Sequence, residues 1–181
     1  MEAPAPVRRT LANACLAAGW IGAASGMVHR WLTLESATAF AAWWLATALV
    51  CAGVSLGLAR QEAKGAGATR EAMGRALPSC AAGLLVSVPF LLGEDWARRV
   101  VWLLPALWMV LYGCGLHAAG HGRLREVGWM GWAYVLGGSG LLLWWTCPLN
   151  QFPPVSDAHV AMGVGFGVVQ AGYGAYLRMR G

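Results

Sequence analysis

The chain contains 181 residues, of which 58% are hydrophobic and only 12% are charged. Soluble domains usually carry about 25% charged residues, so this composition argues against a soluble globular protein. The formal net charge of +5 does not by itself indicate nucleic-acid binding, because a membrane topology explains how the basic residues are distributed.

Six apolar runs approach or reach the length of about 20 residues that a bilayer-spanning helix needs. Most of these runs are apolar on all sides, whereas a helix on the surface of a soluble protein keeps a polar face. The predicted spans cover residues 11–28, 37–58, 77–92, 100–119, 127–145 and 159–177. The sequence therefore predicts an all-α fold, in which residues 1–181 form one polytopic transmembrane helical bundle with six spans.

The first run has a second interpretation. Two arginines precede its apolar stretch, and small residues follow near Ala23 and Ser25, as in a secretory signal peptide. Cleavage there would leave five spans and place the new N-terminus outside the cell.

Prolines and polar segments separate the later spans. Pro89 would kink the third span by removing one backbone hydrogen bond, and Pro78 is predicted to occupy the first turn of that span. Pro105 either opens the fourth span or kinks it. Residues 59–76 are basic and rich in Gly and Ala, so they are predicted to form a solvated or interfacial linker. Residues 146–159 contain three prolines and are predicted to form an irregular hairpin.

The basic residues divide unequally between the two sides of the predicted bundle. With the N-terminus in the cytoplasm, the outer loops hold only Arg30, Arg98 and Arg99. The inner segments hold Arg8, Arg9, Arg60, Lys64, Arg70, Arg75, Arg123, Arg125, Arg178 and Arg180. Lys and Arg gather on the cytoplasmic side of membrane proteins, so both termini are predicted to be cytoplasmic. Tryptophans also gather toward the predicted outer ends, where indole meets the interface: Trp31, Trp43, Trp44, Trp96, Trp102, Trp144 and Trp145.

Three pairs of glycines are spaced four residues apart on a helix face: Gly22 with Gly26, Gly53 with Gly57, and Gly163 with Gly167. Such pairs let helix backbones approach closely inside a bilayer. Each pair is predicted to pack within the bundle, and the same motif can serve a dimer or contact another membrane protein.

Two stretches of the sequence resemble each other. "GWIGAASG" at residues 19–26 is similar to "GWMGWAYVLGGSG" at residues 128–140, and "YGCGLHAAG" at 112–120 is similar to "FGVVQAGYG" at 166–174. Duplicated helical hairpins would explain this similarity, and so would chance in a sequence rich in Gly, Ala and Trp.

Histidines are the candidate ligands for haem or a metal. His29 and His159 lie at outer span ends on different helices, as a haem held between two helices requires. His117 and His121 lie on one face at the inner end of the fourth span, but catalytic zinc needs a third protein ligand, and no HExxH motif is present. Water can reach both pairs at the span ends. The histidines are therefore predicted to be helix-end residues, and no metal ion, haem or other cofactor is predicted.

The remaining reactive residues show no catalytic pattern. The cysteines form no CxxC pair and are predicted to be small side chains, buried within spans in every case but Cys147: Cys15, Cys51, Cys80, Cys114 and Cys147. No acidic residue lies at mid-depth of a span. Polar residues within the spans are predicted to bridge helices: Asn13, Ser25, Thr47, Ser55, Ser87, Ser139 and Gln170. The chain also lacks a nucleophile elbow and a dinucleotide fingerprint, so no catalytic residue is predicted.

The C-terminal half carries a recognisable pattern of Pro-x-Leu-Trp, Tyr-Gly, a short basic turn ending in Glu-Val, Gly-Phe-Gly and Tyr-Gly. The residues are Pro105, Leu107, Trp108, Tyr112, Gly113, Glu126, Val127, Gly165, Phe166, Gly167, Tyr173 and Gly174. This pattern resembles a family of small, uncharacterised bacterial integral membrane proteins, which are often encoded beside a winged-helix regulator. Family members carry a histidine where this chain has Gln170. The resemblance implies a six-span protein of the bacterial inner membrane and implies no activity.

Three hypotheses about function follow. The first is a non-catalytic interaction, sensory or structural subunit of the bacterial envelope, whose partners are the lipid bilayer and other membrane proteins or a second copy. The second is a small transporter or channel for a neutral or apolar solute, since kinked spans and glycines can line a path. The third is a redox protein that binds haem or a metal through the histidines.

Overall fold

The computed structural model describes residues 5–32, 36–61, 66–93, 95–120, 125–147 and 153–180. Every regular element in those ranges is a helix, so the all-α prediction is confirmed there. The elements in chain order are α1 (Ala5–Leu32), α2 (Ala37–Gln61), α3 (Ala66–Leu91), α4 (Asp95–Val100), α5 (Leu103–Gly120), α6 (Arg125–Thr146), α7 (Val155–Met162), the π-helix η2 (Gly163–Val169) and α8 (Gln170–Met179).

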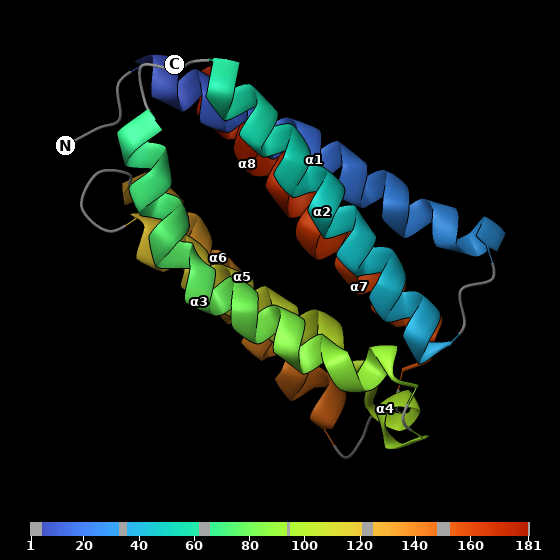
Figure 1. The fold of residues 1–181 in the computed structure, drawn as a ribbon. Coiled ribbons are helices and arrows are strands. Elements are labelled where there is room, and N and C mark those ends of the chain that lie inside the picture. Colours follow the sequence, from blue (N-terminus) through green and yellow to red (C-terminus); the bar gives the residue numbers. More distant parts are fainter. Residues whose placement is uncertain are drawn as a thin grey trace.

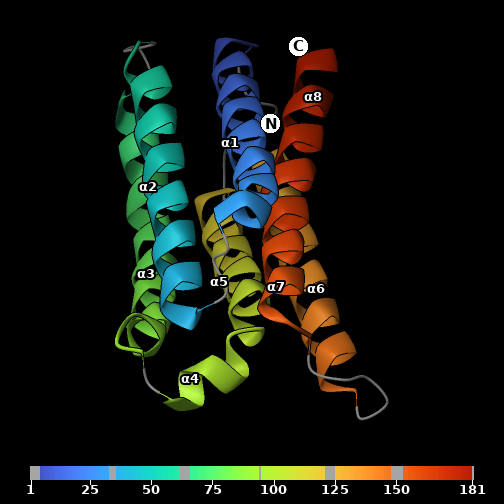
Figure 2. The ribbon, with the colours of Figure 1, turned by 90° about the vertical axis from the view of Figure 1, so that its right-hand side faces the viewer.

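The long helices form a bundle in which the first and last elements lie side by side (Figures 1 and 2). α1 packs along η2 and α8, while α5 packs along both α6 and α3. α2 contacts α1 on one side and α3 on the other. Arg8 Nη1 donates a 2.8 Å hydrogen bond to the carbonyl of Arg180, so the chain enters and leaves the bundle at the same end. The short helix α4 lies at the opposite end (Figure 2).

Five segments of the described chain are long and apolar enough to cross a membrane: Val7–Val28, Ala37–Leu58, Gly74–Leu91, Leu103–Gly120 and Val155–Met179. By helix length and composition, the protein is a multi-pass membrane protein. α6 corresponds to the predicted fifth span but is not among the five. Its 22 residues suffice in length, but many positions hold Trp and Gly, which contribute little hydropathy. The sixth span and the orientation in the membrane stay predictions.

The third span begins earlier than the sequence predicts. α3 starts at Ala66, inside the segment 59–76 that was expected to be a linker, because Ala, Glu, Met and Arg favour a helix strongly enough to outweigh single glycines. Pro78 consequently lies in the helix interior rather than in its first turn, and Pro89 lies in the last turn. Pro105 falls in the first turn of α5, where its missing N–H costs no hydrogen bond.

The last span is continuous but not uniform. α7, η2 and α8 run without a break from Val155 to Met179, and η2 forms a π-helix of seven residues, GVGFGVV. A π-helix pairs each residue with the fifth residue along instead of the fourth; it is rare, and it frequently lies at functional sites. This π-helix was not predicted from the sequence.

Glycines join α1 to the last span. A Cβ added at Gly22 would lie 2.9 Å from the carbonyl oxygen of Phe166, and one at Gly26 would lie 2.7 Å from Gly163 Cα. A Cβ at Gly167 would lie 2.5 Å from the backbone nitrogen of Ala23. Two of the three predicted glycine pairs therefore pack against each other within the bundle.

The third glycine pair has no such neighbour. Around Gly53 and Gly57 on α2, no atom lies within 4 Å of an added Cβ. The intervening Val54 and the preceding Val50 are also exposed. This surface of α2, made by Gly53, Gly57, Val50 and Val54, is called the α2 glycine face below.

Candidate functional site

A cluster of polar side chains lies inside the bundle, where α5, α6 and the last span meet. The hydroxyl of Tyr134 on α6 donates to the carbonyl of Gly165 in η2 at 2.8 Å and approaches Gln170 Oε1 at 2.9 Å. Gln170 Nε2 lies 3.1 Å from the hydroxyl of Tyr112 on α5. Tyr134 and Gln170 are buried, so each hydrogen bond replaces a contact that water would otherwise make.

Aromatic rings surround these hydrogen bonds. Phe166 stacks on Tyr134 with ring centroids 5.4 Å apart, and Tyr112 meets both rings edge-on at 5.3 Å and 5.0 Å. Met109 packs against Tyr134 in the same cluster. The side chains thus fill the space between α5, α6 and the last span, and neither these four residues nor Gln170 carries a charge.

The predicted role of the intramembrane polar residues as bridges between helices is confirmed for four of them. Gln170 joins the last span to α5 and α6. Thr47 on α2 donates to Ser25 on α1 at 3.2 Å, and Ser87 on α3 accepts from Trp108 Nε1 on α5 at 3.1 Å. Sequence reasoning missed Tyr134, because a tyrosine in an apolar run carries no signal that its hydroxyl meets a backbone carbonyl of another helix.

His159 lies in the core, and the expectation that water satisfies its imidazole is wrong. The side chain is 0% exposed, and its Nδ1 accepts a 3.0 Å hydrogen bond from Trp44 Nε1. Phe40 contacts the imidazole ring edge-on at 4.7 Å. An acceptor Nδ1 carries no proton, so this bond fixes the neutral tautomer with hydrogen on Nε2. The burial of Trp44 also removes it from the predicted interfacial belt.

Of the other histidines, only His117 has its side chain within the described residues, so the pairing of His29 with His159 stays untested. His117 on α5 is half-buried, and its ring meets Trp132 of α6 edge-on at 5.4 Å. His29 belongs to α1, but its side chain lies outside the described residues, as does all of His121. Within the described ranges, no group of three or more His, Cys, Asp and Glu residues could hold a metal ion.

The cysteines only partly match the predicted burial. Cys15 is buried and Cys51 is half-buried, whereas Cys80 and Cys114 are exposed on the helix surface. Exposure within a span means contact with lipid, which a small apolar thiol tolerates. All five cysteines are free thiols.

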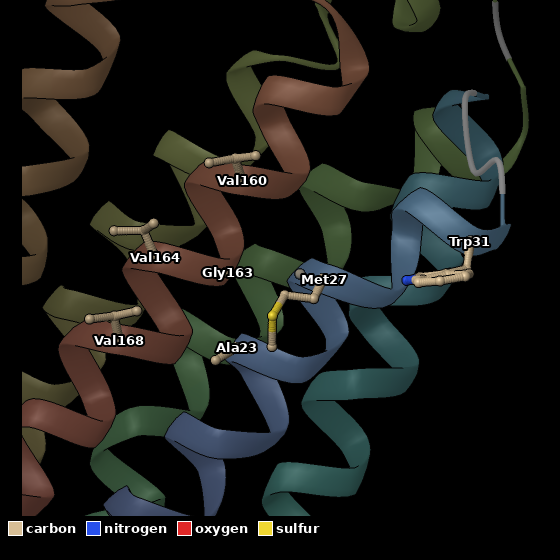
Figure 3. Close-up of a pocket in the computed structure, with 8 residues that line it drawn as sticks. Ala23, Met27, Trp31, Val160, Gly163, Val164 and Val168 are labelled. Carbon is tan, nitrogen blue, oxygen red and sulfur yellow. The ribbon is translucent and has the colours of Figure 1, made fainter.

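An apolar groove opens on the outside of the bundle between α1 and the last span (Figure 3). Its volume is about 810 Å³, and its walls come from Met27 and Trp31 on α1 and from Val160, Val164 and Val168 on α7 and η2. Gly26 and Gly163, which bring the two backbones together, also line it. The surface of the groove is apolar and would suit an acyl chain. Among the side chains that line it, only the Trp31 indole N–H can donate a hydrogen bond.

Comparisons with known proteins give no assignment to set beside this geometry. The chain matches no family model, no curated protein and no solved structure.

Proposed function

We propose that the chain spans the bacterial inner membrane six times, with both termini in the cytoplasm. Three observations support this proposal. α6 runs alongside α5 and holds no charged residue from Val127 to Thr146. The hydrogen bond between Arg8 and Arg180 brings both chain ends to one end of the bundle, as an even number of spans requires. The resemblance of the C-terminal half to small bacterial membrane proteins favours the same location.

Within that topology, the function that the geometry supports best is a non-catalytic interaction or sensory subunit. The observation that carries this proposal is the unequal use of the three glycine pairs. Two pairs pack α1 against the last span, whereas no described atom lies within 4 Å of a Cβ added at either glycine of the α2 glycine face. Small residues four apart favour close contact with another transmembrane helix, so the α2 glycine face is suited to a helix of a partner membrane protein.

A comparison of matched glycine variants tests this function. Gly53→Leu with Gly57→Leu should abolish co-purification of a membrane partner in mild detergent, because leucines keep the helices apart. Gly140→Leu with Gly172→Leu is the control, since these exposed glycines also have no atom within 4 Å of an added Cβ. The control variant should retain the partner. A wild-type protein that purifies strictly alone, or that turns over a substrate, contradicts the proposal.

A transporter for a neutral or apolar solute is the second candidate, and η2 favours it. Transporters often bind their substrate where a spanning helix departs from regular α-helix near the membrane midplane. η2 lies next to Gln170 and the tyrosines, which can donate and accept hydrogen bonds without carrying charge. Reconstituted liposomes should then show flux of a neutral solute, and the absence of flux across a broad panel of solutes rejects this candidate.

A further inference from the structure

The repeated sequences occupy equivalent places in two helix pairs. "GWIGAASG" lies on α1 and "GWMGWAYVLGGSG" on α6, while "YGCGLHAAG" lies on α5 and "FGVVQAGYG" lies on η2 and α8. The contacts pair them in the same way, because α1 packs on η2 and α8 just as α6 packs on α5. In both pairs the helices run antiparallel (Figure 2).

Equivalent residues lie near one another in the two pairs, but their closest contacts differ by about one helical turn. Aligning the two repeats makes Gly19 equivalent to Gly128 and Ala171 equivalent to His117. A Cβ added at Gly19 would collide with the backbone nitrogen of Ala171, whereas one at Gly128 would make only an ordinary contact with His117 Nδ1, at 3.7 Å. The backbone nitrogen of His117 instead lies 2.6 Å from a Cβ added at Gly131.

Comparable contacts lie one turn along each helix. Gly22 is equivalent to Gly131, and Gly167 is equivalent to Gly113. A Cβ at Gly22 would lie 3.2 Å from Gly167 Cα, and one at Gly131 would lie 2.7 Å from the carbonyl oxygen of Gly113. In both pairs, therefore, glycines of one helix face the backbone of the other, although the exact register differs.

The repeats differ in backbone form at one place. α5 is a regular α-helix through all of "YGCGLHAAG", whereas "FGVVQAGYG" begins inside the π-helix η2. Since α5 makes its own close glycine contacts with α6 as an ordinary α-helix, glycine packing alone does not require the π-helix. The glycine contacts therefore do not explain why the second copy contains a π-helix and the first does not.

The residues that differ at this place are those of the polar cluster. Gln170 stands where the first copy has the apolar Leu116. Gln170 is the first residue of α8 and contacts the hydroxyls of Tyr112 and Tyr134, and Tyr134 also donates to Gly165 within η2. Tyr134 of α6 is therefore connected both to Gly165 within η2 and to Gln170, the residue that follows η2 and distinguishes the second copy.

The two halves of the last span both contact α1, but their other neighbours differ. α7 contributes Ala158 and Met162 to a core shared with Phe40 and Trp44 of α2 and with Trp108 of α5. α8 packs mainly along α1. Kinks in helices arise at π-segments and glycines, and η2 combines both between two separately anchored halves.

We propose that η2 is a hinge in the last span and that the Tyr134 hydroxyl, with Gln170, is the latch that holds it in the form seen here. Release of the latch lets η2 bend, so that α7 moves relative to α8 together with the core side chains of α2 and α5 that hold it, as in hinge motions of other proteins. The hinge does not depend on the identity of a partner or a solute. It would allow a conformational change in an interaction subunit and in a transporter alike.

Distances between spin labels test the hinge in a variant in which all five cysteines are replaced by alanine. One label pair at Ser156→Cys and Leu143→Cys reports on the outer half of the last span against α6. The reference pair at Met179→Cys and Trp129→Cys reports on the inner half. All four positions are exposed, so the labels do not disturb the core.

Removing one hydroxyl should change only the outer distance. Tyr134→Phe keeps the ring stack but loses both hydrogen bonds, so the outer pair should broaden or shift by about 5 Å, as expected for a 20° bend over a ten-residue lever. The inner pair should keep the narrow distribution of the parent protein. Tyr112→Phe is the matched control, because Tyr112 contacts Gln170 but not Gly165, and it should leave both distances nearly unchanged.

Two results would overturn the hinge. One is an outer distance that stays unchanged in both Tyr134→Phe and Gln170→Leu, the variant that restores the residue of the first copy. The other is equal broadening of both label pairs, which would mean general loosening of the bundle. If Tyr112→Phe has the same effect as Tyr134→Phe, the contact with Gly165 is not the latch. If Tyr134→Phe does not fold, Gln170→Leu decides alone.

Discussion

Single residues within the spans are held by partners that the sequence does not display. His159 follows a proline-rich segment at the edge of an apolar run, so its position alone suggests contact with water. The structure places it among Phe40, Trp44 and other core residues because α7 begins at Val155 and carries it into the bundle. Gln170, in contrast, was correctly predicted to bridge helices, since a carboxamide at mid-span needs a hydrogen-bond partner in lipid.

The bond between Trp44 and His159 leads to a prediction about stability. His159→Phe should lower the free energy of unfolding by about 1–3 kcal/mol, because the buried indole N–H of Trp44 loses its acceptor. The double variant Trp44→Phe/His159→Phe should cost less than the sum of the two single variants, since neither polar group then remains. Thermal unfolding of all four proteins in one detergent measures the coupling. If the losses of unfolding free energy in the two single variants simply add up in the double variant, the hydrogen bond contributes nothing to stability.

Whole elements were predicted with uneven success, for identifiable physical reasons. Long apolar runs identify α1, α2 and α5 because lipid requires a continuous apolar helix. The start of α3 was missed because its first turns are polar and glycine-containing, although they favour a helix. η2 was missed because its form is associated with a tyrosine on α6, and the sequence of the last span contains no trace of that contact.

The close packing of α1 against the last span through Gly22, Gly26, Gly163 and Gly167, called the interlock, leads to a prediction about stability. Gly167→Ala should destabilise the protein by about 1–3 kcal/mol, because the new methyl group meets the backbone of Ala23 and the helices must separate. Gly172→Ala should leave stability unchanged or slightly raised, since Gly172 is exposed with no atom within 4 Å of an added Cβ and alanine favours a helix. Melting temperatures in detergent compare them, and equal values for the two variants would contradict the interlock.

At the scale of the whole molecule, the distribution of arginines predicts a topology but not which helices touch. The six apolar runs predict where the chain crosses the bilayer, and the side on which Lys and Arg gather predicts its orientation. They do not say that the first helix packs against the last, because glycine pairs on several helices are equally suited to pack together. Of the three glycine pairs, only the one on α2 has no described atom within 4 Å of an added Cβ, and no property of its sequence distinguishes it from the two pairs that are covered.

Reporter fusions test the six-span topology. Fusions at Gln151 and at Gly181 should report opposite sides of the membrane, with Gly181 on the cytoplasmic side, because one span lies between the two sites in the proposed arrangement. A fusion within residues 62–65 should agree with the one at Gly181. The same side for Gln151 and Gly181 would mean that the spans after α5 have been miscounted.

The pairing of α1 with the end of the chain has a consequence for biosynthesis. Ribosomes add about 5–20 residues per second, so on the order of ten seconds pass between the emergence of α1 and that of its partner in the last span. During that interval the small residues of α1 face lipid or the insertion machinery, while α5 and α6, which are adjacent in the chain, can already assemble. The contact between α1 and the last span therefore forms last. A nascent chain that stops before α7 leaves the glycine surface of α1 without its partner, with α2 as the remaining neighbour of α1, and quality-control proteases can recognise that uncovered surface.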